Sequence, residues 1–244
     1  MQGLQIDCRL AGPWCPQASS MHLDSLLAWA AKEVALRRPC AENATYADFI
    51  HDLPLDRKEF DGGEWVWKAS VLHVVGWQKQ ERLYFTQKTP VEPMLLGIAD
   101  GWIEAKGGSK IDTQRNYAKN GQAYITIEHA QGLRAWCVGD PDGVKELLGE
   151  ITSVGVKRRM GLGALLPYAD GSFFRVKQCE QAQTLWMRRA SPVQLIQEST
   201  PFIGSWRAPY WQDMHQQGWT PSRVNLPADC VATAQTNAEQ AATC

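Results

Sequence analysis

The chain has 244 residues, of which 44% are hydrophobic and 21% are charged, a composition that excludes an intrinsically disordered protein. Its formal net charge of −1 excludes a general electrostatic attraction to nucleic acid, so any RNA or DNA site must be a local patch. The seven cysteines include no Cys-x-x-Cys pair, so neither a disulfide framework nor a zinc site is expected.

The length allows one elaborated domain or two small ones, and we favour one. No apolar run approaches the roughly 18 residues that a membrane-spanning helix requires. We therefore expect a cytoplasmic protein with no membrane contact. The 11 tryptophans are many for this length, and most are expected to anchor the core or an interface.

The first predicted elements are a strand and a helix. Apolar residues alternate with polar ones from Gly3 to Leu10, which predicts a strand with one buried face. From about Met21 to Arg38 the apolar residues recur at helical spacing, with Ser20 as a candidate cap and Asp24 in the first turn.

The next segment is predicted to be mainly strand. Residues 53–64 are typical of an exposed connection, and alternation from Trp65 to His73 predicts a strand after it. A second strand is predicted at residues 82–86, and these two could be neighbours in an antiparallel sheet. A further strand is predicted at residues 123–127.

A basic segment precedes that last strand, between residues 106 and 121. A flexible basic loop with one aromatic residue could follow a single-stranded backbone and stack a base, whereas a solvated hairpin loop explains the same residues equally well. Its candidate nucleic-acid-binding residues are Lys106, Lys110, Arg115, Tyr117 and Lys119.

A second helix is predicted after Asp140-Pro141, because proline suits the first helical position and an apolar stripe follows. This helix leads into a glycine-rich segment, in which three cations stand between glycines. Glycine allows tight turns and close approach of the backbone, while lysine and arginine neutralise phosphates. The candidate binding residues are Gly155, Lys157, Arg158, Arg159, Gly161 and Gly163.

The spacing of these glycines matches neither a Walker loop nor the dinucleotide-binding fingerprint. The apolar run that follows Gly163 ends at Pro167, which predicts a short strand rather than a helix. A nucleic-acid backbone is the ligand that fits, and a solvated turn carrying a charge cluster is the alternative.

The remaining residues predict a hairpin at 166–176 that turns at Asp170-Gly171, and a strand at 184–189. An irregular segment rich in proline and tryptophan follows from residue 201 to residue 227. Residues 228–244 have no periodicity and are predicted to be disordered.

His22 is the one candidate catalytic residue. A histidine beside an RNA phosphate could act as general base or acid in metal-independent cleavage. A capping or packing role explains it as well, and no second histidine lies close in sequence. No cofactor and no metal are expected.

The first strand, the segment from His22 to Ala30 (HLDSLLAWA) and the segment from Gly155 to Gly163 together resemble the RAMP superfamily of CRISPR-associated proteins, over roughly residues 3–211. Within it, the chain is most similar to the Cas-five-like subunit of type IV effector complexes, and residues 112–119 resemble the basic loop of that branch. The resemblance implies an α+β fold, namely a ferredoxin-like (RRM-like) domain over residues 1–227.

The resemblance also implies a non-catalytic subunit that holds the 5′ handle of the guide RNA (crRNA). Its partners would be the backbone and large subunits of the complex, with target DNA near the flanking motif. The glycine-rich segment would bind RNA, and the basic segment would form a second wall. Two alternatives remain: an endoribonuclease that processes the guide RNA with His22, and a structural subunit that binds only proteins.

Overall fold

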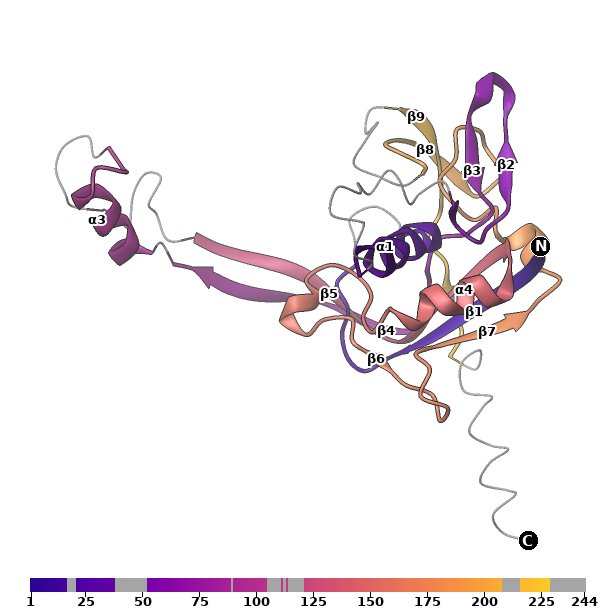
Figure 1. The fold of residues 1–244 in the computed structure, drawn as a ribbon, viewed down its shortest axis with the longest axis horizontal. Coiled ribbons are helices and arrows are strands. Elements are labelled where there is room, and N and C mark those ends of the chain that lie inside the picture. The colour runs from indigo at the N-terminus through magenta and orange to yellow at the C-terminus, as the bar shows by residue number, and fades with distance from the viewer. Residues whose placement is uncertain are drawn as a thin grey trace, which may run out of the picture. The chain divides into compact units, whose positions relative to one another are not determined.

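The computed structural model describes residues 1–16, 21–37, 52–88, 90–104, 111, 113, 121–207 and 216–228. The chain forms two compact units, of which the first comprises Met1–Lys79 with Glu128–Cys244 and the second comprises Gln80–Ile127. The order of helices and strands can be followed in Figure 1, and the fold is a mixed α+β fold, as predicted.

The first unit is built on a six-stranded sheet with β1 (Gln2–Leu10) in its middle. β1 pairs antiparallel with β5 (Gly121–Gly139) on one side and with β6 (Leu165–Leu166) and β7 (Phe174–Gln178) on the other. β4 (His73–Gln87) lies beyond β5, and β10 (Asn225–Leu226) pairs with β4 in parallel. The two helices of this unit that lie against the sheet are α1 (Leu23–Leu36) and α4 (Pro141–Gly149).

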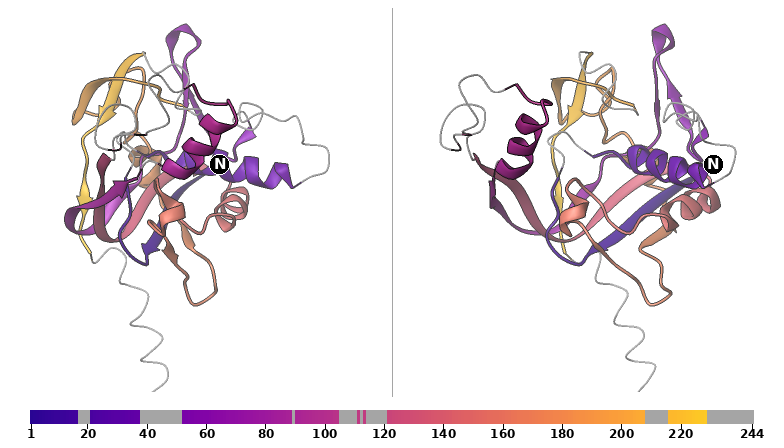
Figure 2. Two further views of the ribbon diagram at one scale, coloured as in Figure 1. Left: turned by 90° about the vertical axis from the view of Figure 1, so that its left-hand side faces the viewer. Right: turned by 60° about the vertical axis from the view of Figure 1, so that its left-hand side comes forward.

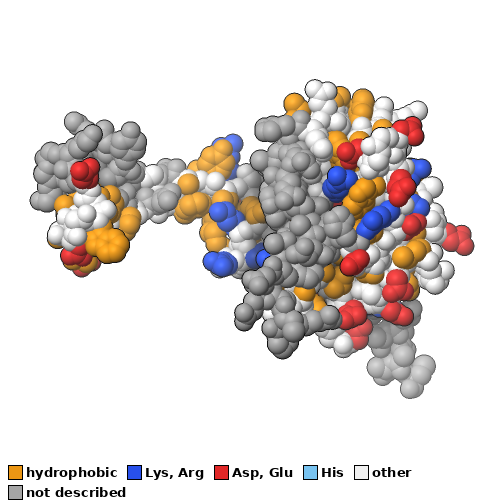
Figure 3. Space-filling view, turned by 45° about the horizontal axis from the view of Figure 1, so that its top comes forward, with side chains coloured by type: hydrophobic (Ala, Val, Ile, Leu, Met, Phe, Trp, Pro, Cys, Tyr) orange, Lys and Arg blue, Asp and Glu red, His pale blue; other side chains and the backbone are white. Residues whose placement is uncertain are grey.

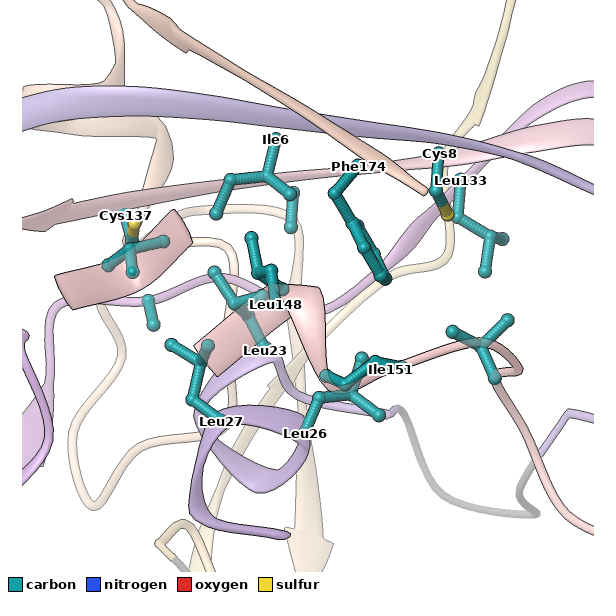
Figure 4. Packing of buried hydrophobic residues seen from close by; sticks show 14 of the residues in the cluster. Ile6, Cys8, Leu23, Leu26, Leu27, Leu133, Cys137, Leu148, Ile151 and Phe174 are labelled. Carbon is teal, nitrogen blue, oxygen red and sulfur yellow. The ribbon is translucent and has the colours of Figure 1, made fainter. Parts of the chain in front are cut away.

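The main hydrophobic core lies between this sheet and the two helices, as Figure 4 shows. Alternate buried residues of β1 face alternate buried residues of β5 in the pairs Leu4–Cys137, Ile6–Ala135 and Cys8–Leu133. Both helices contribute the apolar stripes that their spacing predicts, among them Leu23, Leu26, Leu27, Val144 and Leu148. The opening strand and both helices are therefore confirmed.

The start of α4 is also as predicted. Pro141 occupies the first turn, and the Asp140 side chain accepts a hydrogen bond of 2.8 Å from the Gly143 amide. At α1 the N-cap residue is His22, whose side chain makes no capping bond, and Ser20 lies outside the described residues.

Two smaller sheets complete the first unit, and Figure 2 shows them from two further sides. β2 (Arg57–Glu59) pairs with β3 (Trp65–Trp67) across the 3-10 turn η2 (Asp61–Gly63), and β8 (Ser199–Ile203) pairs with β9 (Gln217–Pro221). A second core cluster contains Val66, Val138, Trp186, Ala190 and Trp206. Two tryptophans thus anchor this cluster.

The described residues of the second unit include the end of β4, the start of β5 and the helix α3 (Val91–Ala99). No residue of α3 is buried.

Several predictions for residues 53–86 were wrong. Residues 57–59 and 61–63 are exposed as predicted, but Leu53 and Leu55 are buried, and residues 57–59 form a short strand. The alternation from Trp65 to His73 spans β3 and the first residue of β4, and residues 82–86 belong to the same β4. The two predicted strands are therefore not neighbours in an antiparallel sheet. The prediction failed because alternation shows which side of a strand is buried but not which strand is its partner.

The later part of the chain also differs from the prediction. Residues 182–185 form the short helix α5 where a strand was expected, because four residues are too few to show a helical period. The turn at residues 168–172 exists, but β6 and β7 each pair with β1 rather than with one another. The segment from residue 201 to residue 227, predicted to be irregular, contains most of the antiparallel pair β8–β9. Both strands contain a proline, which short strands at the edge of a sheet can accommodate.

The prediction of one domain over residues 1–227 stays a prediction. Residues 229–244, most of the predicted tail, lie outside the described residues.

Candidate nucleic-acid interface

The segment from Ser153 to Ala164, here called the glycine loop, is closed by backbone hydrogen bonds at its base. The Val154 amide donates to the Gly163 carbonyl over 2.8 Å. The base is also held by the chain after β1, since the Gly163 amide donates to Pro13 over 2.9 Å and the Val156 amide to Cys15 over 2.9 Å. The loop is therefore fixed to the end of β1 and leads into the predicted short strand, β6.

The three glycines of this loop all have left-handed backbone angles, with φ of +87° at Gly155, +79° at Gly161 and +71° at Gly163. A Cβ at Gly163 would collide with the carbonyl oxygen of Val154, whereas a Cβ at Gly161 would meet open space. Gly163 thus permits a close approach of two backbone segments, and Gly161 only a turn.

The cations stand at the tip of the loop, around the 3-10 turn η4 (Arg158–Met160). Lys157 has φ of +61° and is the one non-glycine residue with positive φ in the part of the chain that the structure describes. Lys157 and Arg159 are exposed, while Arg158 is half-buried with its guanidinium 4.6 Å from the centre of the Trp29 ring on α1. The loop thus presents two cations to solvent and fixes the third.

Cys15 lies at the base of the loop and does not add a negative charge there. Burial raises the pKa of its thiol, with the positive charge of Lys157 acting in the opposite direction. The thiol is therefore protonated at neutral pH, and the charge of the loop is that of its cations.

A second basic cluster lies on the sheet face that points away from the main core. The guanidinium carbons of Arg9 on β1 and Arg175 on β7 each lie 4.6 Å from the centre of the Tyr168 ring. Asp7, the acidic residue between them, forms an ion pair of 2.5 Å with Arg134. Because this pairing neutralises Asp7, the cluster has excess positive charge.

Sequence reasoning missed this cluster. The polar residues of β1 did alternate with the apolar ones, but nothing in the sequence showed that Tyr168 and Arg175 would meet them. Burial raises the pKa of Tyr168 to about 12, so its phenol stays neutral and adds no charge of its own.

A hollow of about 390 Å³ lies between α4 and the segment that contains β7. The charged residues of its lining are Lys145, Arg175 and Asp170. Hydrogen bonds from the side chain and amide of Ser172 lower the pKa of Asp170, so this carboxylate stays ionised at neutral pH and offsets part of the positive charge of the two cations.

The second unit carries an exposed group of aromatic and cationic side chains on β4 and β5, which sequence reasoning also missed. The Arg82 guanidinium carbon lies 4.7 Å from the centre of the Tyr124 ring, and the Tyr84 and Tyr124 rings lie 5.8 Å apart. Both tyrosines are about half exposed, at 55% and 53%. Aromatic faces beside a cation can stack bases and contact phosphates.

The basic segment between residues 106 and 121, predicted from sequence to bind nucleic acid, lies almost entirely outside the described residues. Its candidate residues Lys106, Lys110, Arg115, Tyr117 and Lys119 all lie outside the described residues.

A known protein family matches most of the chain. Residues 2–221 match the protein family "CRISPR type IV associated protein Csf3". The chain belongs to this family. No curated protein matches it. The predicted association with type IV CRISPR systems is thereby confirmed.

His22, the candidate catalytic residue, lies in the interior of this Csf3-family chain. Its side chain is 4% exposed, and its Nε2 accepts a hydrogen bond of 3.0 Å from the Ala190 amide. Asp24, in the same helix turn, forms an ion pair of 3.6 Å with Arg189, and both side chains are fully buried. The motif at the start of α1 therefore holds residues 189–190 in place.

Neither a metal-binding group nor a membrane-spanning helix occurs among the described residues. No group of three or more histidine, cysteine, aspartate or glutamate side chains stands ready to hold a metal ion among the residues described. Within the same residues, no helix is long and apolar enough to span a membrane.

Proposed function

We propose that this chain is a non-catalytic, guide-RNA-binding subunit of a type IV CRISPR effector complex. It holds the 5′ handle of the crRNA, contacts the backbone and large subunits, and helps to position target DNA near its flanking motif in the cytoplasm. The observation that carries the proposal is the glycine loop, which presents Lys157 and Arg159 to solvent from a base fixed to β1. Exposed cations on a backbone held close by glycines suit a phosphodiester chain.

The fold supports membership of the RAMP superfamily as a Cas-five-like protein. The elements β1, α1, β4, β5, α4 and β7 occur along the chain in the order β-α-β-β-α-β, with β2, β3, α3 and β6 inserted between them. In the sheet their strands lie in the order β4-β5-β1-β7. This succession is the one on which ferredoxin-like domains are built. The glycine loop then lies between the second helix and the strands that return to β1.

Two further groups supply contacts of the kind that single-stranded RNA needs. Tyr84 and Tyr124 offer ring faces to bases, with Arg82 beside them for a phosphate. In the first unit, Arg9 and Arg175 supply positive charge around Tyr168. With these two groups, the protein offers a guide RNA more contacts than the glycine loop alone provides.

A non-catalytic role is supported by the position of His22. A general base must lie within hydrogen-bonding reach of the proton that it takes, and His22 is buried with its Nε2 bound to a backbone amide. Burial of the thiol likewise keeps Cys15 protonated. The described residues therefore favour RNA binding over RNA cleavage.

The test is the salt dependence of binding to a labelled guide-repeat RNA, measured by fluorescence anisotropy. The double variant Lys157→Gly/Arg159→Ala removes two exposed cations and keeps a residue that accepts the left-handed angle at position 157. Each lost phosphate contact lowers the salt slope by about 0.7, so the double variant should lose up to about 1.4. Lys58→Ala, at an exposed position on β2, is the matched control and should keep the native slope.

The same RNA is then run on a denaturing gel, with the chain alone and reassembled with the backbone and large subunits. Intact RNA with a loop-dependent slope would support the proposal. A slope equal to the native one in the double variant would contradict the role of the glycine loop. A discrete cut that needs no metal would move the function to a guide-processing endoribonuclease, and a complex that assembles without binding RNA would make the chain a purely structural subunit.

A further inference from the structure

We infer that the segment Val91–Glu104, here called the α3 knob, is a protein-docking element that inserts into an apolar groove bordered by lysine and arginine on a neighbouring protein subunit. The identity of that neighbour as a subunit of the same complex rests on the proposed function. The docking mode itself rests on four features of the knob: its exposed apolar residues, its short helix, its fixed turn and its charge.

The α3 knob exposes more large apolar side chains than a free surface normally does. Trp102 is 86% exposed, Leu96 60%, Leu95 39% and Ile103 38%. All of them lie within nine residues of one another in the chain, and no residue of α3 is buried. Contiguous apolar exposure of this kind marks an interaction site, and an exposed tryptophan is a frequent energetic centre of one.

The helix is too short to be stable by itself. α3 has nine residues, whereas isolated helices below about 12 residues are marginal in water. In a folded protein the missing stability comes from burial of an apolar face. The described residues of the second unit do not bury such a face of α3. A partner that covers Leu95, Leu96 and Trp102 would supply it.

The turn after α3 fixes the position of the exposed tryptophan. The amides of Trp102 and Ile103 both donate to the Gly97 carbonyl, over 2.8 and 3.0 Å. Gly101 provides the left-handed residue of the turn, with φ of +74°, and the Ile103 side chain folds back over Gly97, where a Cβ would crowd it. A binding element that is ordered beforehand loses less conformational entropy on docking.

Charge identifies the kind of partner. Residues 90–104 contain Glu92, Asp100 and Glu104 and no lysine or arginine. Figure 3 shows red acidic side chains beside the orange hydrophobic ones on this segment. Three carboxylates repel the phosphates of nucleic acid and of anionic lipids, and a contact between the knobs of two copies would bring carboxylates together. A protein groove with an apolar floor and a basic border is complementary to both properties of the knob.

The neighbouring strands have the opposite character. β4 and β5 of the same unit carry Arg82 and the two exposed tyrosines, which suit nucleic acid. The second unit therefore combines two strands whose side chains suit RNA, β4 and β5, with the acidic and apolar α3 knob. A helix laid in a groove fits the knob, with Leu95 and Leu96 on α3 and Trp102 in the turn after it as the anchors.

The experiment measures binding of the full chain to each purified protein subunit of the effector complex by biolayer interferometry. Trp102→Ala should weaken binding to one of them at least tenfold, and Leu96→Ala severalfold, because both remove anchors from the groove. Glu92→Lys/Glu104→Lys should weaken the same interaction by reversing the charge of the knob. Ile203→Ala, which removes a side chain that is 67% exposed in the first unit, is the matched control and should bind as the native chain does.

Native affinity of the Trp102→Ala variant for every subunit would overturn the inference. So would a concentration-dependent dimer of the native chain that Trp102→Ala abolishes, since the occupant would then be a second copy. Trp102-dependent binding to guide RNA or to phosphatidylglycerol vesicles would also overturn it. The Lys157→Gly/Arg159→Ala variant separates the two proposals, because it should lose RNA affinity and keep the interaction that depends on Trp102.

Discussion

The guanidinium of Arg158 stacks on the indole ring of Trp29, with 4.6 Å between the guanidinium carbon and the ring centre. This contact joins the tip of the glycine loop to α1, two segments that together suggested the family from sequence. A cation held over an aromatic ring keeps its charge while its position is restricted. The stack therefore fixes the tip of the loop from which Lys157 and Arg159 project.

Replacing Trp29 should loosen the tip of the loop without changing its charge. In Trp29→Leu, Arg158 loses the ring on which it stacks, so the amides of residues 157–161 should exchange faster with deuterium. RNA affinity should fall by about twofold to fivefold, equivalent to the roughly 0.5–1 kcal/mol of an exposed cation–π contact. Trp29→Phe keeps an aromatic face and should lie between native and leucine. Exchange rates in Trp29→Leu that equal the native ones would show that the base of the loop alone fixes its tip.

The glycines of the loop should differ in their sensitivity to substitution. Gly163→Ala forces a Cβ against the Val154 carbonyl and should destabilise the chain by more than about 2 kcal/mol. Gly161→Ala meets open space and should cost only about 1 kcal/mol for its left-handed backbone. Urea denaturation of both variants measures the difference, and equal losses would mean that the close approach at Gly163 is unimportant.

Local periodicity predicted the parts of this fold that bury one regular face. The alternation from Leu4 to Leu10 and the helical spacing around Leu26 and Leu148 each reflect one buried side, so the strand and both helices were found. The start of α4 after Asp140-Pro141 was found because the preference of proline for the first helical turn is a local property.

Contacts between distant segments could not be predicted in this way. Asp24 was expected only to favour the helix N-terminus, yet it lies buried against Arg189. The cluster of Arg9, Tyr168 and Arg175 likewise depends on β1 and β7 being neighbours, which no residue pattern in either segment specifies. The exposed apolar knob was missed because sequence alone does not show that α3 lacks a buried face.

Removing His22 should damage the fold rather than a reaction. His22→Ala leaves the buried Ala190 amide without its acceptor, and an unsatisfied buried donor costs about 1–3 kcal/mol. RNA binding at low temperature, where the variant remains folded, should match the native chain within about twofold. His22→Gln, whose side-chain oxygen can accept a hydrogen bond, should recover part of the stability. An RNA-cutting activity in the native chain that both variants lose while folded would instead make His22 catalytic.

His73 should make the stability of the chain depend on pH below neutrality. Burial lowers its pKa from 6.5 to about 4, and the nearby Arg188 acts in the same direction. The folded state therefore holds the neutral imidazole, while the unfolded state takes up a proton as the pH falls below 6.5. The contribution of His73 to the free energy of unfolding is complete above pH 6.5. This contribution is lost as the pH falls towards 4, by at most about 1.4 kcal/mol per pH unit.

The comparison with His73→Gln isolates this group, because all other titrating residues remain. The difference in unfolding free energy between native chain and variant should shift by about 2 kcal/mol between pH 6.5 and 5, with the native chain losing more on acidification. Urea denaturation at half-unit pH steps gives this difference directly. Parallel pH profiles for the two proteins would mean that His73 takes up its proton equally readily in the folded state, despite its burial against Trp136.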